Sequence, residues 1–186
     1  YIDLLNTVYR PDTMINFLDS IEGYVLPEME AHCDRWGGSV VEWQTNVQKI
    51  RNFINTRYSI LPAGLNNCYD LNGPYEVNFN VVPPVAGKMK INSIYPPEVP
   101  WGGYYYGGIN TKLIAEETNP TYEFDKWILN NHEVFPNDTT KEVTMEFTTG
   151  DYIIAQFKPK DFADSLVINE INYNSSIEVD PGDWVE

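Results

Sequence analysis

The sequence contains few cysteines and no long apolar segment. Its 186 residues include only Cys33 and Cys68, which are too few for a disulfide framework and match no metal-binding spacing. The two cysteines either form one bridge or remain as buried free thiols, and the sequence favours the thiols. No signal peptide opens the chain, and no apolar run reaches the roughly 18 residues that span a bilayer. We therefore expect no membrane insertion.

Basic residues are also scarce. The chain has 12 Lys and Arg against 27 Asp and Glu, a formal net charge of -15. Such a charge repels phosphate, which argues against nucleic-acid binding. Residues 161–186 hold seven acidic and no basic side chains, so this segment differs in composition from the rest. It is either a solvated acidic tail or a further module that is cut short.

The first 70 residues have a helical pattern. Pro11 is suited to a helix start, Pro27 interrupts or restarts the helix, Gly37-Gly38 ends it, and Ser39 begins the next one. Apolar residues recur at helical spacing in two stripes: Met14, Phe17, Leu18, Ile21, Tyr24 and Val25, and then Trp43, Val47, Ile50 and Ile54. Three short helices bury little apolar surface. We expect them to pack on the rest of the chain or on protein outside it.

From Tyr75 onward the period changes to two. Alternation predicts six strands, around 75–81, 89–91, 113–115, 122–124, 143–147 and 152–157, separated by Gly, Pro and Asn. The sequence therefore predicts an α+β fold, with helices over 1–70, a small and mostly antiparallel β-domain over 71–160, and the acidic segment 161–186. Leu166 to Tyr173 is one more candidate strand, and an unpaired edge there would permit self-association.

Catalytic and metal-binding patterns are missing from the sequence. The two histidines, His32 and His132, lie in different segments, and we interpret them as structural because no Ser/His/Asp or Cys/His set accompanies them. Glu116 and Glu117 are strand neighbours that point to opposite faces, so they cannot act as a dyad. We assign no catalytic, cofactor-binding or metal residue, and expect no cofactor.

Consecutive tyrosines give the sequence its one candidate binding surface. If Tyr104, Tyr105 and Tyr106 form a strand, at least one of them faces away from the core. With Trp101 nearby, that face could stack on a sugar ring or bind a partner protein. The structural alternative places Trp101 and Tyr105 in the β-core and leaves the other tyrosines as ordinary exposed aromatics. Both interpretations stay open, with Trp101, Tyr104 and Tyr106 as the candidate ligand-binding residues.

Three stretches resemble known bacterial families. The segment 27–36 (PEMEAHCDRW), followed by Trp43, Val47, Asn52-Phe53 and Arg57, resembles the C-terminal helices of the spore-coat protein H (CotH) family, whose members have an atypical protein-kinase-like domain. The glycine and aromatic pattern of 75–159 is similar to bacterial β-repeats related to internalin B-repeats. Val167 to Tyr173, followed by Asp183 to Glu186, resembles the start of a lamin-tail domain.

The resemblance implies a secreted or cell-surface bacterial protein. In CotH-like kinases the groups that hold ATP and Mg²⁺ lie upstream of these helices, so no catalytic residue carries over to this sequence. We expect a non-catalytic C-terminal piece that acts as a structural spacer or adhesion module. The alternatives are a carbohydrate- or protein-binding module that uses the Trp101–Tyr106 region, and an accessory part of a kinase whose active site is upstream. The partners would be polysaccharide or surface protein.

Overall fold

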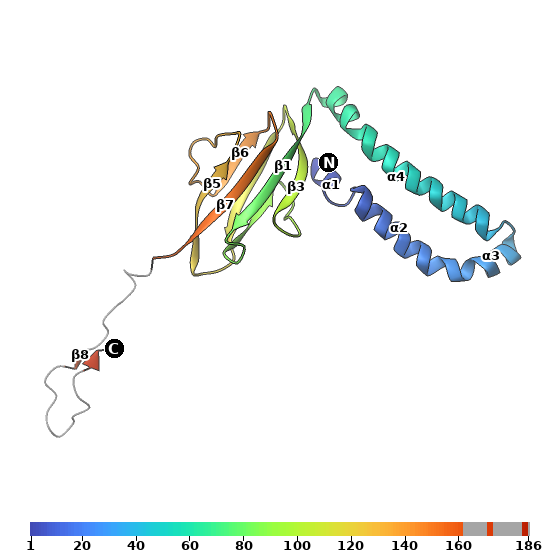
Figure 1. Cartoon of the computed structure of the whole chain (residues 1–186), viewed down its shortest axis with the longest axis horizontal. Helices are drawn as coiled ribbons and strands as arrows, with labels where there is room; N and C mark the ends of the chain where they lie inside the picture. Colours follow the sequence, from blue (N-terminus) through green and yellow to red (C-terminus); the bar gives the residue numbers. More distant parts are fainter. Residues whose placement is uncertain (162–170, 173–183, 186) are drawn as a thin grey trace, which may run out of the picture.

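The computed structural model describes residues 1–161, 171–172 and 184–185. The chain has the predicted α+β fold, with helices up to residue 69 and strands from residue 72 onward. The helices form an arm that projects from one end of a β-domain (Figure 1). They are α1 (Ile2–Leu5), α2 (Pro11–Val25), the short 3-10 helix η1 (Leu26–Glu28), α3 (Met29–Trp36) and α4 (Val40–Tyr69).

The helix boundaries lie where the sequence signals predict them. Pro11 occupies the first turn of α2, and the 3-10 helix around Pro27 separates α2 from α3. Gly37 and Gly38 then adopt positive φ values of 84° and 93°, which glycine tolerates best. The Ser39 hydroxyl caps α4 by accepting a hydrogen bond from the Glu42 N–H at 3.2 Å. The short helix α1 gives no comparable signal in the sequence.

The two long helices of the arm, α2 and α4, form an antiparallel pair (Figure 1). Val47 and Ile54 are the buried side chains of α4, and α2 has no buried residue. Between the helices, the Arg51 guanidinium forms ion pairs with Asp19 and Glu22 of α2. The pair is therefore held by one narrow row of contacts, which leaves most of its surface uncovered.

The β-domain consists of two sheets. One has the strand order β3-β1-β7-β5 and the other the order β2-β4-β6. All neighbours are antiparallel except β1 and β7, so the expected mostly antiparallel arrangement is confirmed. The strands are β1 (Asn72–Val82), β2 (Gly87–Ile91), β3 (Trp101–Gly107), β4 (Asn110–Glu117), β5 (Tyr122–Leu129), β6 (Glu142–Glu146) and β7 (Asp151–Pro159).

One apolar core lies between the two sheets. The inward residues follow the predicted alternation: Val77, Phe79 and Val81 in β1, Leu113 and Ala115 in β4, Val143 and Met145 in β6, and Ile153, Ala155 and Phe157 in β7. Trp127 is 2% exposed in the same core. The buried residues of this core all come from the β-domain, and Ile2 of the arm packs against it from outside.

Strand β3 and the C-terminal segment go beyond the strands expected from alternation. β3 pairs with β1 although its glycines interrupt the alternating pattern. In the acidic segment, β8 (Ile171–Asn172) pairs antiparallel with β9 (Trp184–Val185). The rest of the predicted strand Leu166–Tyr173, and any self-association through it, lies outside the described residues.

Candidate functional site

The arm is fastened to the β-domain by α1 and the residues that follow it. Asn6 is 2% exposed and bonds the main chain of Tyr104 twice: its Nδ2 donates to the carbonyl at 2.8 Å, and its Oδ1 accepts the N–H at 2.7 Å. Because β3 is the outer strand of its sheet, the Asn6 amide occupies an edge where another strand could pair.

A second contact joins α1 to the other sheet. The Asp3 carboxylate accepts hydrogen bonds from Asn92 Nδ2 and from the Ser93 N–H, both at 3.0 Å, and from the Ser93 hydroxyl. Asn92 directly follows β2. We call Asp3 and Asn6 with these partners the α1 clasp. Because the α1 clasp forms hydrogen bonds to both sheets, it fixes the N-terminal end of the arm relative to the β-domain.

The predicted aromatic surface is only partly accessible. Tyr104 is 46% exposed, but Trp101 and Tyr106 are 7% and 2% exposed. Trp101 lies in the core against Phe79, with ring centroids 6.0 Å apart, so its assignment as a surface ligand-binding residue is wrong. Of the structural alternative, the core positions of Trp101 and Tyr105 are correct, whereas the expected exposure of Tyr106 is not.

Tyr106 is buried because the arm covers it. A small hollow of about 190 Å³ lies between the arm and the β-domain, and is lined by Leu5, Asn6, Tyr58, Ser59, Pro62, Pro74, Tyr104 and Tyr106. Burial raises the pKa of Tyr58 and of Tyr106 above the usual range of a phenol. The volume of this small hollow is below the roughly 300–1,000 Å³ of small-molecule sites, so the hollow suits one side chain or one ring.

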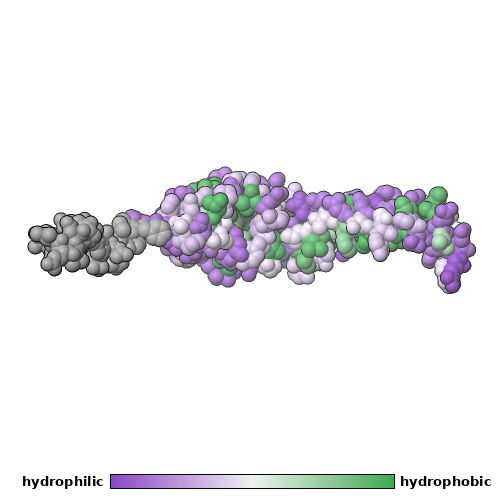
Figure 2. Space-filling view, turned by 90° about the horizontal axis from the view of Figure 1, so that it is seen from below, coloured by the Kyte–Doolittle hydropathy of each residue, from purple (hydrophilic) through white to green (hydrophobic). Residues whose placement is uncertain are grey.

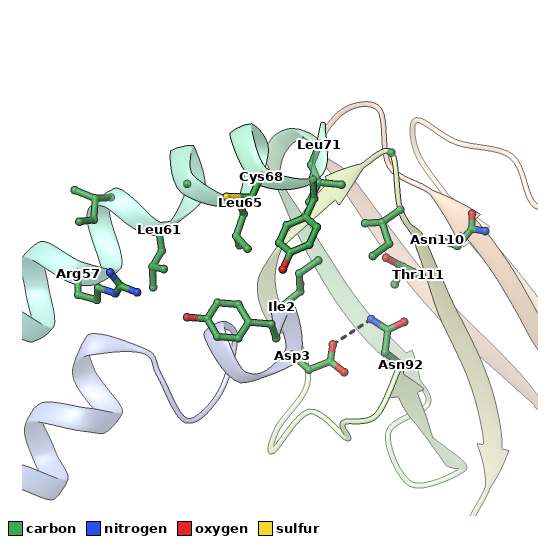
Figure 3. Close-up of a pocket in the computed structure, with 16 residues that line it drawn as sticks. Ile2, Asp3, Arg57, Leu61, Leu65, Cys68, Leu71, Asn92, Asn110 and Thr111 are labelled. Atoms are coloured by element: carbon green, nitrogen blue, oxygen red, sulfur yellow. Dashed lines mark hydrogen bonds between the residues drawn. The ribbon is translucent and has the colours of Figure 1, made fainter.

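A larger hollow of about 950 Å³ opens on the other side of α4 (Figure 3). Its walls come from α1, from the second half of α4 and from the segment 108–111, and the aliphatic lining is Ile2, Ile60, Leu61, Leu65, Leu71 and Ile109. Arg57 lies at its arm end and has no ion-pair partner within the part of the chain that the structure describes. No local sequence pattern predicts this hollow, because its walls come from segments that are far apart along the chain.

Six large apolar side chains are exposed on one side of the arm. They are Phe17, Ile21 and Tyr24 of α2 and Ile50, Phe53 and Ile60 of α4, between 46% and 87% exposed. We call them the apolar face. On each helix, the exposed residues come one position before residues that face the other helix. Phe17, for example, comes before Leu18, and Phe53 comes before Ile54. Because the helices are antiparallel, the same offset turns both sets to the same side. On the side of the molecule drawn in Figure 2, hydrophobic residues lie at intervals along the arm.

Acidic residues avoid the apolar face. From Trp43 to Tyr69, α4 has no Asp or Glu, although the chain has 27. The acids of α2 bond elsewhere: Asp19 and Glu22 pair with Arg51, and Asp12 pairs with Arg10. The larger hollow lies on the same side as the apolar face, since Arg57 and Ile60 line it. Together they form one apolar surface with a cationic group.

His132 belongs to a buried polar cluster that sequence spacing does not reveal. Its Nδ1 lies 2.7 Å from Asp151 Oδ2, and its Nε2 accepts the Thr148 N–H at 3.0 Å. Both ring nitrogens are thus used by the chain itself, which agrees with the predicted structural role. His32, by contrast, is exposed on α3 rather than packed against its neighbours.

The remaining candidates for chemistry stay apart. Glu116 bonds Tyr95 and Lys88, whereas Glu117 bonds Lys141, so the two carboxylates do not form a pair. Cys33 and Cys68 are free, as expected, but Cys33 is only partly buried and Cys68 is exposed, so neither is the buried thiol that the sequence predicts.

Neither a metal site nor a membrane-spanning helix is found among the described residues. They contain no group of three His, Cys, Asp or Glu side chains placed to hold a metal ion. Each of the described helices is too short or too polar to span a bilayer.

Comparisons with known proteins add no relative. A scan against protein-family models, a search of curated proteins and a search of solved structures each found no match to this chain.

Proposed function

We propose that this chain is a non-catalytic docking and spacer module of a secreted or surface-attached bacterial CotH-like protein. The arm docks on a protein domain through the apolar face, and the β-domain serves as a rigid spacer or adhesion module. The observation that carries this proposal is the set of six exposed apolar side chains on one acid-free side of the arm. Large contiguous apolar patches on soluble proteins mark interaction sites.

The size of the expected effect follows from burial. Covering a half-exposed Phe, Ile or Tyr side chain stabilises a complex by roughly 1 kcal/mol before the costs of association. Six such side chains give on the order of 6 kcal/mol, most of which is offset by an association cost of about 4 kcal/mol or more, whereas micromolar affinity requires a net free energy of about 8 kcal/mol. The apolar face therefore supports a weak contact by itself, and a stable one when the partner also makes polar bonds.

The resemblance of the arm to the C-terminal helices of CotH proteins suggests the partner. In this proposal the arm packs on a CotH-type kinase-like domain, and phosphotransfer belongs to that domain alone. The α1 clasp supports a spacer role, because Asp3 and Asn6 tie the arm to both sheets and so hold the docked domain at a fixed orientation.

The docking role is tested with a CotH-family kinase-like domain of the source organism, produced as a separate polypeptide. Calorimetric titration should show that it binds this chain, and that Phe53→Ser weakens binding by about tenfold, the equivalent of 1.4 kcal/mol. Val41→Ser is the matched control, because Val41 is also an exposed apolar residue of α4 but lies outside the apolar face. No binding, or equal losses in both variants, would contradict the proposal.

A second candidate function uses the tyrosines of the small hollow. Tyr58, Tyr104 and Tyr106 line it together with two prolines, a set that suits one sugar ring or one apolar side chain. In a polysaccharide panel, Tyr104→Ala should abolish binding while the fold persists, because Tyr104 is half exposed. If no polysaccharide binds, or if the variant binds as well as the wild type, this candidate fails.

A further inference from the structure

Arg57 is an unusual residue for its position. It lies on the side of α4 that carries Ile50, Phe53 and Ile60, at the mouth of the larger hollow. No carboxylate of the described residues pairs with it, whereas Arg51, two turns earlier, has two carboxylate partners. In a chain with more than twice as many acids as bases, an unpaired guanidinium among apolar side chains is suited to an acidic group from outside.

Gly64 opens the floor of the same hollow. It lies inside α4, where glycine is a poor helix former, and a Cβ placed on it would meet no atom within 4 Å. Around it stand the aliphatic side chains of Leu61 and Leu65 and, across the gap, Ile2 (Figure 3). A bulky apolar side chain of a partner can therefore enter beside Gly64.

From these observations we infer that the docking partner presents a helix that lies along α4, pairs an acidic side chain with Arg57 and inserts a bulky apolar side chain beside Gly64. This inference rests on the proposed docking function and adds the chemistry of the partner. It follows from the line of Phe53, Arg57, Ile60 and Gly64 on α4, at spacings of three and four residues. A helix in the groove beside α4 presents side chains at the same spacings.

A second copy of the chain fits this surface less well than an unlike partner. Two copies would bring together two net charges of -15, whose mutual repulsion opposes association. They would also bring Arg57 to a face that has no acid in the α4 sequence from Trp43 to Tyr69. A partner helix with one acidic and several apolar residues supplies a carboxylate for Arg57 and apolar side chains that cover the apolar face.

The test uses two synthetic helical peptides of about 18 residues, a length that covers the line from Ile50 to Cys68. Both carry leucines at spacings of three and four, and they differ only in a central Glu or Lys. Fluorescence anisotropy should show that the wild-type chain prefers the Glu peptide by about tenfold. The variant Arg57→Glu should reverse that preference.

Two glycine variants test the hollow without disturbing the core. Gly64→Leu occupies the space beside position 64 and should weaken binding of the Glu peptide by about tenfold. Gly23→Leu is the matched control: Gly23 also lies within a helix with open space around its Cβ position, but it is not on the apolar face, and binding should not change. Circular dichroism verifies that both variants keep their helices.

The outcomes separate this inference from the proposed function. The inference is wrong if both peptides bind with equal affinity, or if the two glycine variants bind the Glu peptide equally well. This holds even when Phe53→Ser still weakens binding of the kinase-like domain. If the chain binds the Glu peptide more tightly than the Lys peptide but does not bind the kinase-like domain, the proposed partner is wrong and the inference stands. A dimer in light scattering that Phe53→Ser dissociates would show that a second copy occupies the face, and would overturn the inference.

Discussion

The buried carboxylate of Asp151 allows a sharp test of how the β-domain is held together. Its side chain is fully buried, and its Oδ1 accepts the main-chain N–H groups of Asn130, Asn131 and Tyr152 at 2.9, 3.1 and 2.7 Å. Its Oδ2 faces Nδ1 of His132. Because Nε2 of His132 accepts an N–H, the neutral ring carries its proton on Nδ1 and donates it to Asp151.

The variant Asp151→Asn cannot satisfy this arrangement in either orientation of its amide. If the amide oxygen accepts the three main-chain N–H groups, the NH₂ group faces the Nδ1–H of His132. If the amide is reversed, the NH₂ group faces the three N–H groups. Either orientation leaves at least one buried N–H group facing another donor, and each such group costs about 1–3 kcal/mol, with the upper end expected here because the lost acceptor was charged. For a domain of this size each kcal/mol lowers the Tm by about 4–8 °C, so the drop is on the order of 20 °C.

Urea denaturation followed by the fluorescence of Trp101 and Trp127 measures this loss, since both indoles lie in the core. Asp138→Asn is the control: it makes the same chemical change at an exposed side chain, and should alter the free energy of unfolding by no more than about 0.5 kcal/mol. A loss below about 1 kcal/mol for Asp151→Asn would refute the reasoning, because it would show that the buried bonds are not essential.

Three further outcomes are expected. Asn6→Ala should lower the free energy of unfolding by about 1–3 kcal/mol in the same assay, because it removes both bonds to Tyr104; no change would contradict the α1 clasp. Burial raises the pKa of the Tyr105 phenol above the value of about 10 that it has in the unfolded chain. The stability contributed by the protonated phenol is therefore complete below about pH 10 and is lost as pH rises toward the raised pKa of the folded state. Tyr105→Phe should therefore lose less stability between neutral and strongly alkaline pH than the wild type; equal losses would contradict this. Incubation with labelled ATP and Mg²⁺ should show no phosphate transfer by this chain, and appreciable transfer would overturn its non-catalytic assignment.

The parts of the fold that depend on neighbouring residues could be predicted from the sequence. Pro11, the glycine pair 37–38 and Ser39 fix helix ends through their own backbone chemistry, and the structure has those ends. The alternation of Val77, Phe79 and Val81 with polar residues predicts a strand with one buried face, because side chains in a strand point alternately to its two sides. The change of period near residue 70 likewise marks where the arm ends.

Features that join distant segments could not be predicted in this way. Asn6 bonds Tyr104 across 98 residues, and no local pattern distinguishes it from any other asparagine. The same holds for His132 and Asp151, which are 19 residues apart. The sequence leaves the core and surface positions of Trp101 both open, because an aromatic residue beside glycines suits an exposed turn as well as a core strand, and the packing of Trp101 against Phe79 decides between them.

The way the arm is attached has a mechanical consequence. One end of the hairpin is gripped by the α1 clasp, and the other continues from α4 into β1 after only two residues. A hairpin held at both roots behaves as a stiff lever rather than a tether. A load applied near α3 is therefore transmitted as torque to the bonds of Asp3 and Asn6 at the edges of both sheets and to the junction of α4 and β1.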